Sequence, residues 1–407
     1  MGASGRRLTG ARAAATLADL GPASTAARAV RRMQQLREQF GAGPVELVLP
    51  GRRMVVVLDP DDVRRVLAGA PEPFHPANRE ERKSLEWSQR RDLDDAALDS
   101  GAEMHRLAGA FGDVIAAEAR ELTDEVTARG TMDANQFMAA WWRIVRRIAL
   151  GDRARDDDEI TDALLRLRRA RNWSFLSMPH YRTRARFLER LYDYVEDPQI
   201  GTLAAAVPAS GAVDPVGPLP QWLFAFDAAG IAQLRALAVL ATHPAAMARA
   251  IEDAAEPDRL RLRPFLRACV LESVRLWPTT PTILRETTEK GAGFMIVTPA
   301  FHRDPKLLPF ANDFVPDIWL DGRARSYPQL VPFSAGPAEC PGRNLALFTT
   351  STLLANLLSA LDFRLSSMPH LSPDEPLPVT LNQHGLEFAV VTAPRWRHHR
   401  AGSAVRS

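Results

Sequence analysis

Apolar and polar residues recur along most of this chain with the spacing of an α-helix. Residues 25–41 and 59–69 carry apolar side chains at helical spacing, and each run ends at a glycine. Between them, 45–51 and 53–60 are short runs rich in valine and leucine, and a Gly-Arg pair separates them. The pattern therefore predicts a helix, a β-hairpin and a second helix near the N-terminus.

The middle of the chain is helical almost throughout 86–152, and it leads to one unusually apolar segment. Residues 222–244 have barely a charged side chain except Asp227 and Arg235. A helix this apolar is buried on nearly all sides, which is typical of the centre of a large domain. The Pro- and Gly-rich residues 206–220 before it predict an internal loop. Further helices are predicted over 244–254 and 262–278, and β-strands over 293–301 and 377–394.

Together these elements indicate one large domain over 1–407 that is mainly α with small β-sheets. We expect residues 1–30 to form a flexible N-terminal arm. Arginine, aspartate and glycine interrupt the alanine-rich start of the chain, so it has neither the apolar core of a signal peptide nor a membrane span. These features favour a soluble protein that does not bind a membrane.

Composition narrows the class of protein further. The chain is 46% hydrophobic with a net charge of +2, which is ordinary for a globular protein and gives no global reason to expect a nucleic-acid partner. Cys269 and Cys340 are too few for a disulfide framework, and their spacing matches no zinc site. This cysteine usage predicts a reducing, cytoplasmic setting.

The first candidate feature is an ion pair between an acidic and a basic side chain. Glu272 and Arg275 are three positions apart in a predicted helix, so they share one face and can pair. Most isolated pairs of this kind are exposed to solvent. Here the apolar neighbours, among them Val274 and Trp277, favour burial. A buried Arg–Glu pair needs further hydrogen bonds to offset its desolvation, so we expect a network that fixes part of the backbone.

The second candidate is a cysteine 65 positions after Arg275. Phe333, Gly336, Cys340 and Gly342 give the spacing F-x-x-G-x-x-x-C-x-G. This spacing predicts a turn tight enough to need glycine, an aromatic wall, and a thiol just before a helix N-terminus. The helix dipole and the free amides there favour thiolate over thiol. Taken alone, a single cysteine is more often a buried structural residue.

The two motifs together resemble those of the bacterial, soluble cytochrome P-450 family of haem-thiolate enzymes. The resemblance covers most of the chain in order, from the N-terminal hairpin through the central helix, the E-x-x-R pair and the cysteine loop to a C-terminal β-hairpin. It implies the cytochrome P-450 fold and haem b, iron protoporphyrin IX, as cofactor. It also implies that Cys340 is the axial ligand of the iron and that Glu272 and Arg275 are a structural pair. Thiolate ligation favours O–O cleavage, the chemistry that the family shares.

The resemblance assigns further residues to cofactor binding. Phe333, Gly336 and Gly342 would border the haem, and Trp87, Arg91 and Arg285 match family positions that contact its propionates. A guanidinium forms strong charge-assisted bonds with a carboxylate. Without the rest of the pattern, the W-x-x-x-R spacing of Trp87 and Arg91 fits any amphipathic helix, and Arg285 fits a strand-edge surface residue equally well.

The chain also departs from the family. The central helix of the family carries an acid followed by an alcohol for proton delivery, but here Asp227 is followed by Ala228. An acid in so apolar a run is costly without a function or a partner, so we expect Asp227 to be the catalytic proton relay, with a salt-bridged structural role as the alternative. Ser334 replaces a usual glycine, Ala338 a usual basic propionate partner, and Ile318 an arginine that normally joins the Glu272–Arg275 network.

For function, the resemblance implies a monooxygenase of secondary metabolism that activates dioxygen. It would hydroxylate or oxidatively couple a small apolar or aromatic natural product. Electrons would come from a ferredoxin and its reductase, and Arg90 and Arg343 would give a basic face to that acidic partner. The missing alcohol leaves open a peroxide-using haem peroxygenase. The lost propionate contacts and a short segment before Trp87 leave open a non-catalytic haem-thiolate scaffold that recruits a partner.

Overall fold

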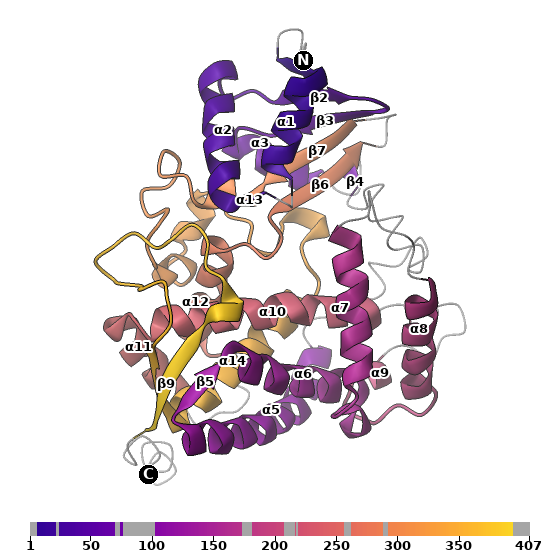
Figure 1. Ribbon diagram of the computed structural model, residues 1–407, viewed down its shortest axis with the longest axis vertical. Coiled ribbons are helices and arrows are strands. Elements are labelled where there is room, and N and C mark those ends of the chain that lie inside the picture. Colours follow the sequence, from indigo (N-terminus) through magenta and orange to yellow (C-terminus); the bar gives the residue numbers. More distant parts are fainter. Residues whose placement is uncertain are drawn as a thin grey trace. The chain divides into compact units, whose positions relative to one another are not determined.

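The computed structural model describes residues 6–21, 24–69, 74–75, 102–172, 181–206, 216, 219–255, 262–287 and 292–393. The chain divides into two compact units. The first comprises Met1–Glu86, Leu271–Cys340 and Asp374–Leu381, and the second comprises Trp87–Val270, Pro341–Pro373 and Asn382–Ser407. Among the described residues helices dominate and each unit carries one β-sheet (Figure 1), which confirms the predicted fold class.

One mixed β-sheet organises the first unit. Its strands are β1 (Arg7–Thr9), β2 (Val45–Leu49), β3 (Arg52–Val56), β4 (Phe74–His75), β6 (Thr282–Thr287) and β7 (Ala292–Val297). They lie in the order β1-β2-β3-β7-β6-β4. β2 and β3 form the predicted antiparallel hairpin, and β3 then pairs in parallel with β7 from the C-terminal half of the chain. The sheet therefore joins segments that are far apart in sequence.

Four helices of the first unit share an apolar core with this sheet. They are α1 (Gly10–Leu20), α2 (Ala26–Phe40), α3 (Pro60–Ala68) and α13 (Thr298–His302). The side chain of Asp59 caps α3 by accepting from the Asp61 amide, as its acidic start predicts. Residues 1–30, expected to be a flexible arm, contain β1 and α1, because Leu8, Ala13 and Leu20 are buried in this core. Short 3-10 turns follow at η2 (Pro316–Trp319), η3 (Arg323–Ser326) and η4 (Gly336–Ala338).

The second unit is mainly a helical assembly. Its helices are α5 (Ala102–Arg129), α6 (Ala134–Leu150), η1 (Asp152–Ala154), α7 (Asp158–Asn172), α8 (Tyr181–Glu196), α9 (Leu203–Ala206), α10 (Leu219–Leu240), α11 (Pro244–Ala254), α14 (Arg343–Ala360) and η5 (Gln383–Gly385). A three-stranded sheet has the order β5 (Thr131–Asp133), β9 (Glu387–Thr392), β8 (Leu361–Leu365). The helix α12 (Pro264–Leu276) contributes its residues up to Val270 to this unit and the rest to the first.

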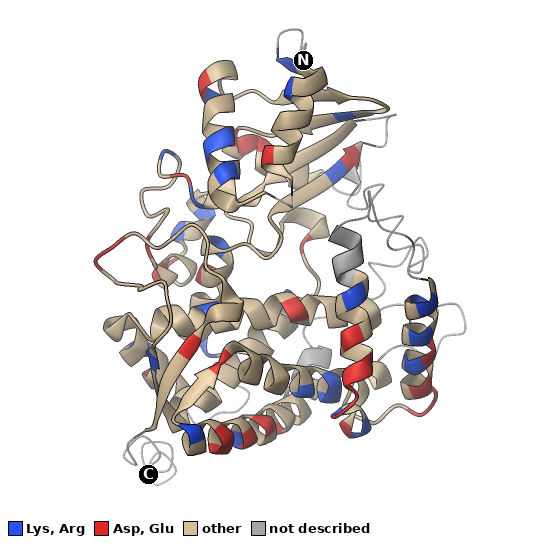
Figure 2. Ribbon diagram, in the orientation of Figure 1, with Lys and Arg blue, Asp and Glu red and all other residues tan. Residues whose placement is uncertain are grey.

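The predicted central helix is α10, and it is the most apolar helix of the second unit. Figure 2 shows it almost without charged residues. It packs against α6, where Trp141 Nε1 donates a hydrogen bond of 2.8 Å to the carbonyl oxygen of Phe226. By length and composition α10 could cross a membrane, but 72% of its apolar stretch is buried within the protein, as in the core helix of a folded domain.

Three element predictions need correction or fall partly outside the described residues. The strand predicted over 293–301 ends at Val297, and α13 follows because Pro299 sits in its first turn. In the described part of the predicted range 377–394, up to Ala393, there is no separate hairpin: only β9 is a strand there, and it pairs with β8 and β5. Near the start of this range, the backbone carbonyl oxygens of Leu377 and Pro378 accept hydrogen bonds from the side chains of Arg303 and Trp277. Most of the predicted loop 206–220 lies outside the described residues, and α10 begins at Leu219.

Candidate functional site

Glu272 and Arg275 form a fully buried ion pair on α12. Arg275 Nε donates to Glu272 Oε2 at 2.9 Å, and Arg275 Nη2 donates to Glu272 Oε1 at 2.6 Å. The same guanidinium donates to the backbone carbonyl oxygens of His302, Ala311 and Asp313 at 2.9, 3.0 and 2.7 Å. These bonds offset the cost of desolvating the charge and fix the backbone that follows α13.

A tryptophan completes this network where the resemblance predicts an arginine. Ile318 is fully buried and apolar, so it cannot replace that arginine. Its neighbour Trp319 donates from Nε1 to Glu272 Oε2 at 2.9 Å, and the amide of Val315 donates to Glu272 Oε1 at 2.9 Å. Sequence reasoning left open whether another residue substitutes or the network shrinks, and the indole of Trp319 is the substitute.

His302 links this network to the segment that leads to Cys340. Its carbonyl oxygen accepts from Arg275, and its ring Nε2 lies 3.1 Å from the Val331 amide. Burial, together with the positive charge of Arg275, lowers the pKa of His302 to about 3, so the ring is neutral at pH 7. Sequence reasoning missed His302. The available signal was a His-Arg-Asp run directly after the apolar residues 293–301, and all three of its side chains are buried.

The cysteine loop is held by its own backbone. The Ser334 amide donates to the Val331 carbonyl at 3.1 Å, and the Cys340 amide donates to the Phe333 carbonyl at 2.9 Å. Gly336 has a φ of +72°, and a Cβ there would clash with the carbonyl oxygen of Leu67 in α3. The turn therefore needs glycine at Gly336. Phe333 and Cys340 are both partly exposed, whereas Cys269 is buried.

Arg285 reaches this loop from β6. Its side chain is buried, Nη2 donates to the Ser334 hydroxyl at 2.9 Å, and Nη1 donates to the Leu284 carbonyl at 2.9 Å. Ser334 has a φ of +64°, the left-handed region that glycine favours. The structure thus brings together Arg285, Ser334 and Cys340 within the first unit.

The other predicted site residues lie elsewhere. Gly342 directly precedes α14 with an ordinary φ of −80°, and its carbonyl accepts from the Ala346 amide, so its backbone does not require glycine. Asp227 lies on α10 in the second unit and is only 9% exposed. Trp87 and Arg91 lie outside the described residues. Ala338 is apolar and supplies no cation to the loop.

Comparisons with known proteins identify the fold. A sequence model of the family described as cytochrome P-450 matches residues 232–390. Cytochrome P-450 714A2 of Arabidopsis thaliana is 35% identical over 136 residues, which cover 30% of this chain and 26% of that protein. The structure of retinoic-acid-bound cyanobacterial CYP120A1 is similar with a TM-score of 0.72 and 16% identity, over 93% of this chain and 96% of that chain. Residues 232–390 therefore match the cytochrome P-450 family in sequence, and the fold of nearly the whole chain is that of the cytochrome P-450 structures.

Two further comparisons show how far the similarity in sequence and in fold extends. Drimenol monooxygenase of Persicaria hydropiper is 30% identical over 155 residues, 32% of this chain and 30% of that protein. The structure of the cytochrome P-450 CYP102L1 has a TM-score of 0.69 at 18% identity, over 89% of this chain and 94% of that chain. The chain therefore spans less than a third of the length of these two curated relatives, 26% and 30%. Likeness to the solved structures extends over nearly the whole chain, and it concerns the fold.

Similarity to cytochromes P-450 implies haem, and the residues of the cysteine loop fit this group. Cys340 offers a partly exposed thiol at the end of a loop fixed by backbone bonds. The missing Cβ of Gly336 allows the loop to lie against Leu67. Arg285 is a buried cation that donates to the Ser334 hydroxyl of this loop, and a guanidinium also forms charge-assisted bonds with a carboxylate such as a haem propionate.

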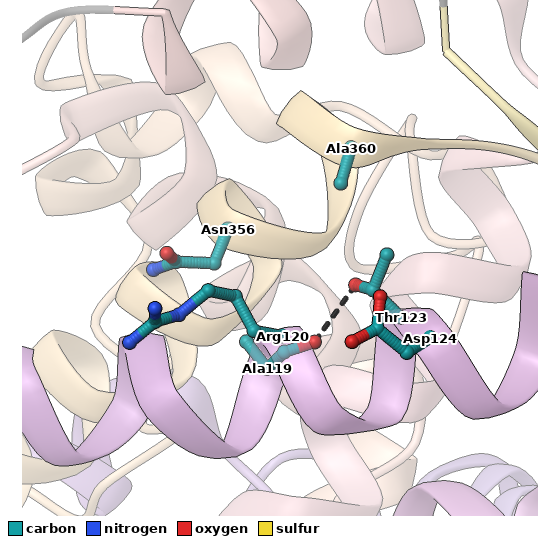
Figure 3. A pocket seen from close by; sticks show the side chains of 6 residues that line it. All are labelled: Ala119, Arg120, Thr123, Asp124, Asn356 and Ala360. Atoms are coloured by element: carbon teal, nitrogen blue, oxygen red, sulfur yellow. Dashed lines mark hydrogen bonds between the residues drawn. The ribbon is translucent and has the colours of Figure 1, made fainter.

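A small cavity between α5 and α14 is separate from these residues (Figure 3). It has a volume of about 140 Å³ and is lined by Ala119, Arg120, Thr123, Asp124, Asn356 and Ala360. Sites for cofactors and drug-sized ligands usually measure roughly 300–1,000 Å³. We therefore assign neither haem nor substrate to this cavity.

Proposed function

We propose that this protein is a haem-thiolate monooxygenase that hydroxylates or oxidatively couples a small apolar or aromatic molecule. The Cys340 loop carries the proposal, because it presents a partly exposed thiol and, at Ser334, accepts a hydrogen bond from the buried Arg285. Haem b, when bound, would supply the activation of dioxygen. In hydroxylation one oxygen atom of dioxygen enters the substrate and the other leaves as water, which consumes two electrons and two protons. The name of one relative, drimenol monooxygenase, supports this reaction class.

Each residue of the candidate site has a proposed part. Cys340 Sγ would be the axial ligand of the iron, and Arg285 would bind a propionate through its guanidinium. Phe333 would border the cofactor, and Gly336 lets the loop approach α3 without a clash. The carboxyl group of Asp227 would hold and pass on a proton, with water or substrate in place of the alcohol that Ala228 lacks.

The deciding experiment is the absorption spectrum of the reduced protein with carbon monoxide. We expect a strongly red-shifted Soret band in the wild type and its loss in Cys340→Ala. Cys269→Ala is the matched control, because Cys269 is the other cysteine and is buried away from solvent. Absence of bound haem from the wild type, or an unchanged band in Cys340→Ala, contradicts the proposal.

The role of Asp227 has its own test. Asp227→Asn keeps the size of the side chain but removes its acid, so we expect turnover to fall about a hundredfold with haem content unchanged. Asp162→Asn, whose side chain is 62% exposed on α7, should turn over at the wild-type rate. Equal rates in Asp227→Asn and wild type would leave Asp227 with a structural role.

We further propose a ferredoxin, supplied by its reductase, as the electron donor. Burial and the nearby positive charge of Arg343 lower the pKa of Arg267, so an acidic partner would relieve the repulsion between these two cations. Arg343→Glu should slow reduction by ferredoxin, most strongly at low salt, whereas Arg364→Glu on an exposed position of β8 should not. Turnover with hydrogen peroxide but none with ferredoxin would favour a peroxygenase.

A further inference from the structure

Ser334 has a backbone conformation that serine rarely adopts. Its φ of +64° lies in the left-handed region, and among the described residues only Arg263 is another non-glycine residue with a positive φ. A Cβ in this region costs free energy that glycine avoids. Strain of this kind persists where the surrounding structure or a function requires the side chain. The question is therefore what the hydroxyl group of Ser334 does that glycine could not.

The hydroxyl group accepts a hydrogen bond from a buried cation. Arg285 Nη2 donates to Ser334 Oγ at 2.9 Å, and Arg285 is only 5% exposed. The Arg285 Nη1 donor is directed to the Leu284 carbonyl on the same strand. These two bonds hold the guanidinium plane at two points. A charge-assisted bond is stronger than one between neutral groups, so the Ser334 bond can offset backbone strain.

Ser334 belongs to the same short loop as Cys340. Its amide donates to the Val331 carbonyl, and the adjacent Phe333 accepts from the Cys340 amide. The hydroxyl bond therefore couples the position of Arg285 on β6 to the loop that presents the thiol. Ala338 supplies no second cation in this loop, so the orientation of Arg285 matters more.

We propose that Ser334 is a positioning residue that holds the Arg285 guanidinium ready to bind a haem propionate. This inference rests on the proposed haem-thiolate function. An arginine side chain loses conformational freedom when it binds a carboxylate, and a hydrogen bond that fixes it beforehand reduces that loss. The left-handed conformation of Ser334 is retained because it directs the hydroxyl toward Arg285.

Two substitutions at this position separate positioning from strain. Ser334→Ala removes the hydroxyl and keeps the strained backbone, whereas Ser334→Gly removes both. We expect both variants to release haem to excess apomyoglobin about tenfold faster than wild type. At the same time, haem-free Ser334→Gly should unfold at a higher denaturant concentration than haem-free Ser334→Ala. Ser326→Ala, at an exposed position of η3, should release haem at the wild-type rate.

A double-mutant cycle ties the effect to Arg285. In an Arg285→Gln background, Ser334→Ala should not speed haem release further, because the group that it positions is gone. Additive effects, or wild-type release rates in both Ser334 variants that keep the Cys340-dependent Soret band, would overturn this inference alone. A wild-type chain that binds no haem would overturn both the inference and the proposed function.

Discussion

Arg275 and Arg64 each pair with a carboxylate at i, i+3 spacing in a helix, but they differ in burial. The Arg275–Glu272 side chains are 0% exposed, and the Arg64–Asp61 side chains are both 68% exposed. Removing one partner of a buried pair leaves an uncompensated charge and costs about 3–5 kcal/mol. The loss of an exposed pair costs about 0.5 kcal/mol or less. In denaturant titrations, Arg275→Gln should therefore lose about 3 kcal/mol of unfolding free energy, and Arg64→Gln should stay near wild type. Similar losses in both variants would contradict this.

His302 gives the stability of the protein a defined pH dependence. Burial lowers its folded pKa to about 3, against about 6.5 in an unfolded chain. Between these values the unfolded chain binds a proton that the folded chain does not, so stability falls as the pH falls through this window. The slope is about 1.4 kcal/mol per pH unit for one proton.

His302→Gln should remove this contribution. We expect the stability of wild type relative to His302→Gln to decline steadily from pH 6 to pH 4, measured by urea unfolding. His384→Gln, at an exposed position of η5, should run parallel to wild type over the same range. Parallel curves for His302→Gln and wild type would show that this ring titrates as it does in the unfolded chain.

At the scale of residues, contacts within one helical turn can be predicted from the sequence, whereas contacts between distant segments cannot. The pairing of Glu272 with Arg275 follows from spacing alone, because both lie within one helical turn. The bond from Trp319 to Glu272 depends on a loop without periodicity, so no local pattern predicts it. The sequence shows that Ser334 replaces a glycine. Its left-handed backbone and its bond to Arg285 appear only in the folded chain.

At the scale of elements, two glycines at the start of 3-10 turns differ in the space around their Cα atoms. Gly322 precedes η3 with a φ of +84°, and a Cβ added to it would have no other atom within 4 Å, whereas a Cβ on Gly336 would clash with the Leu67 backbone. Gly322→Ala should cost only the left-handed penalty, about 1–2 kcal/mol. Gly336→Ala should cost about 3 kcal/mol or more, because η4 and α3 must also move apart. Equal losses of stability in the two variants, measured by thermal unfolding, would mean that the contact between Gly336 and Leu67 relaxes without cost.

The packing of α10 against α6 depends on Gly230. A Cβ at this position would lie 2.5 Å from the indole of Trp141, which donates its Nε1 hydrogen to the Phe226 carbonyl. Gly230→Ala should therefore lose stability by about 1–3 kcal/mol despite the better helix propensity of alanine. Gly109→Ala in α5, where nothing lies within 4 Å, should gain about 0.5–1 kcal/mol. A gain in both variants, measured by calorimetry, would show that Trp141 adapts.

Elements whose signals are local were predicted well, and those that depend on distant partners were not. The helical spacing and terminal glycine of α2, and the run of valines in β3, are complete within a few residues. The pairing of β9, by contrast, cannot be deduced from the residues of β9 alone. Its partners β8 and β5 come from other parts of the chain, so the C-terminal sequence suggested a hairpin that the described residues do not form.

At the scale of the whole molecule, each compact unit is assembled from three separate stretches of the chain. Hydrophobic periodicity carries no mark of the boundaries after Val270 and after Cys340, because neither falls in a long polar linker. One boundary falls inside α12, and another falls directly after Cys340. The single domain expected over 1–407 stays a prediction.

Because the first unit is interleaved in this way, we expect its N-terminal stretch not to fold on its own. Residues 1–86 contain β1, β2 and β3, but β3 needs β7 as its neighbour, with Val55 opposite Phe294. The core of the first unit also takes Ile296 and Phe301 from the later stretch. A fragment of residues 1–86 should therefore lack a cooperative unfolding transition by circular dichroism, since it leaves an apolar sheet face and a strand edge uncovered. Adding residues 271–381, which carry β6, β7 and α13, should restore protection of the β3 amides against hydrogen exchange. Cooperative unfolding of the 1–86 fragment alone would mean that the hairpin and its helices are sufficient without β7.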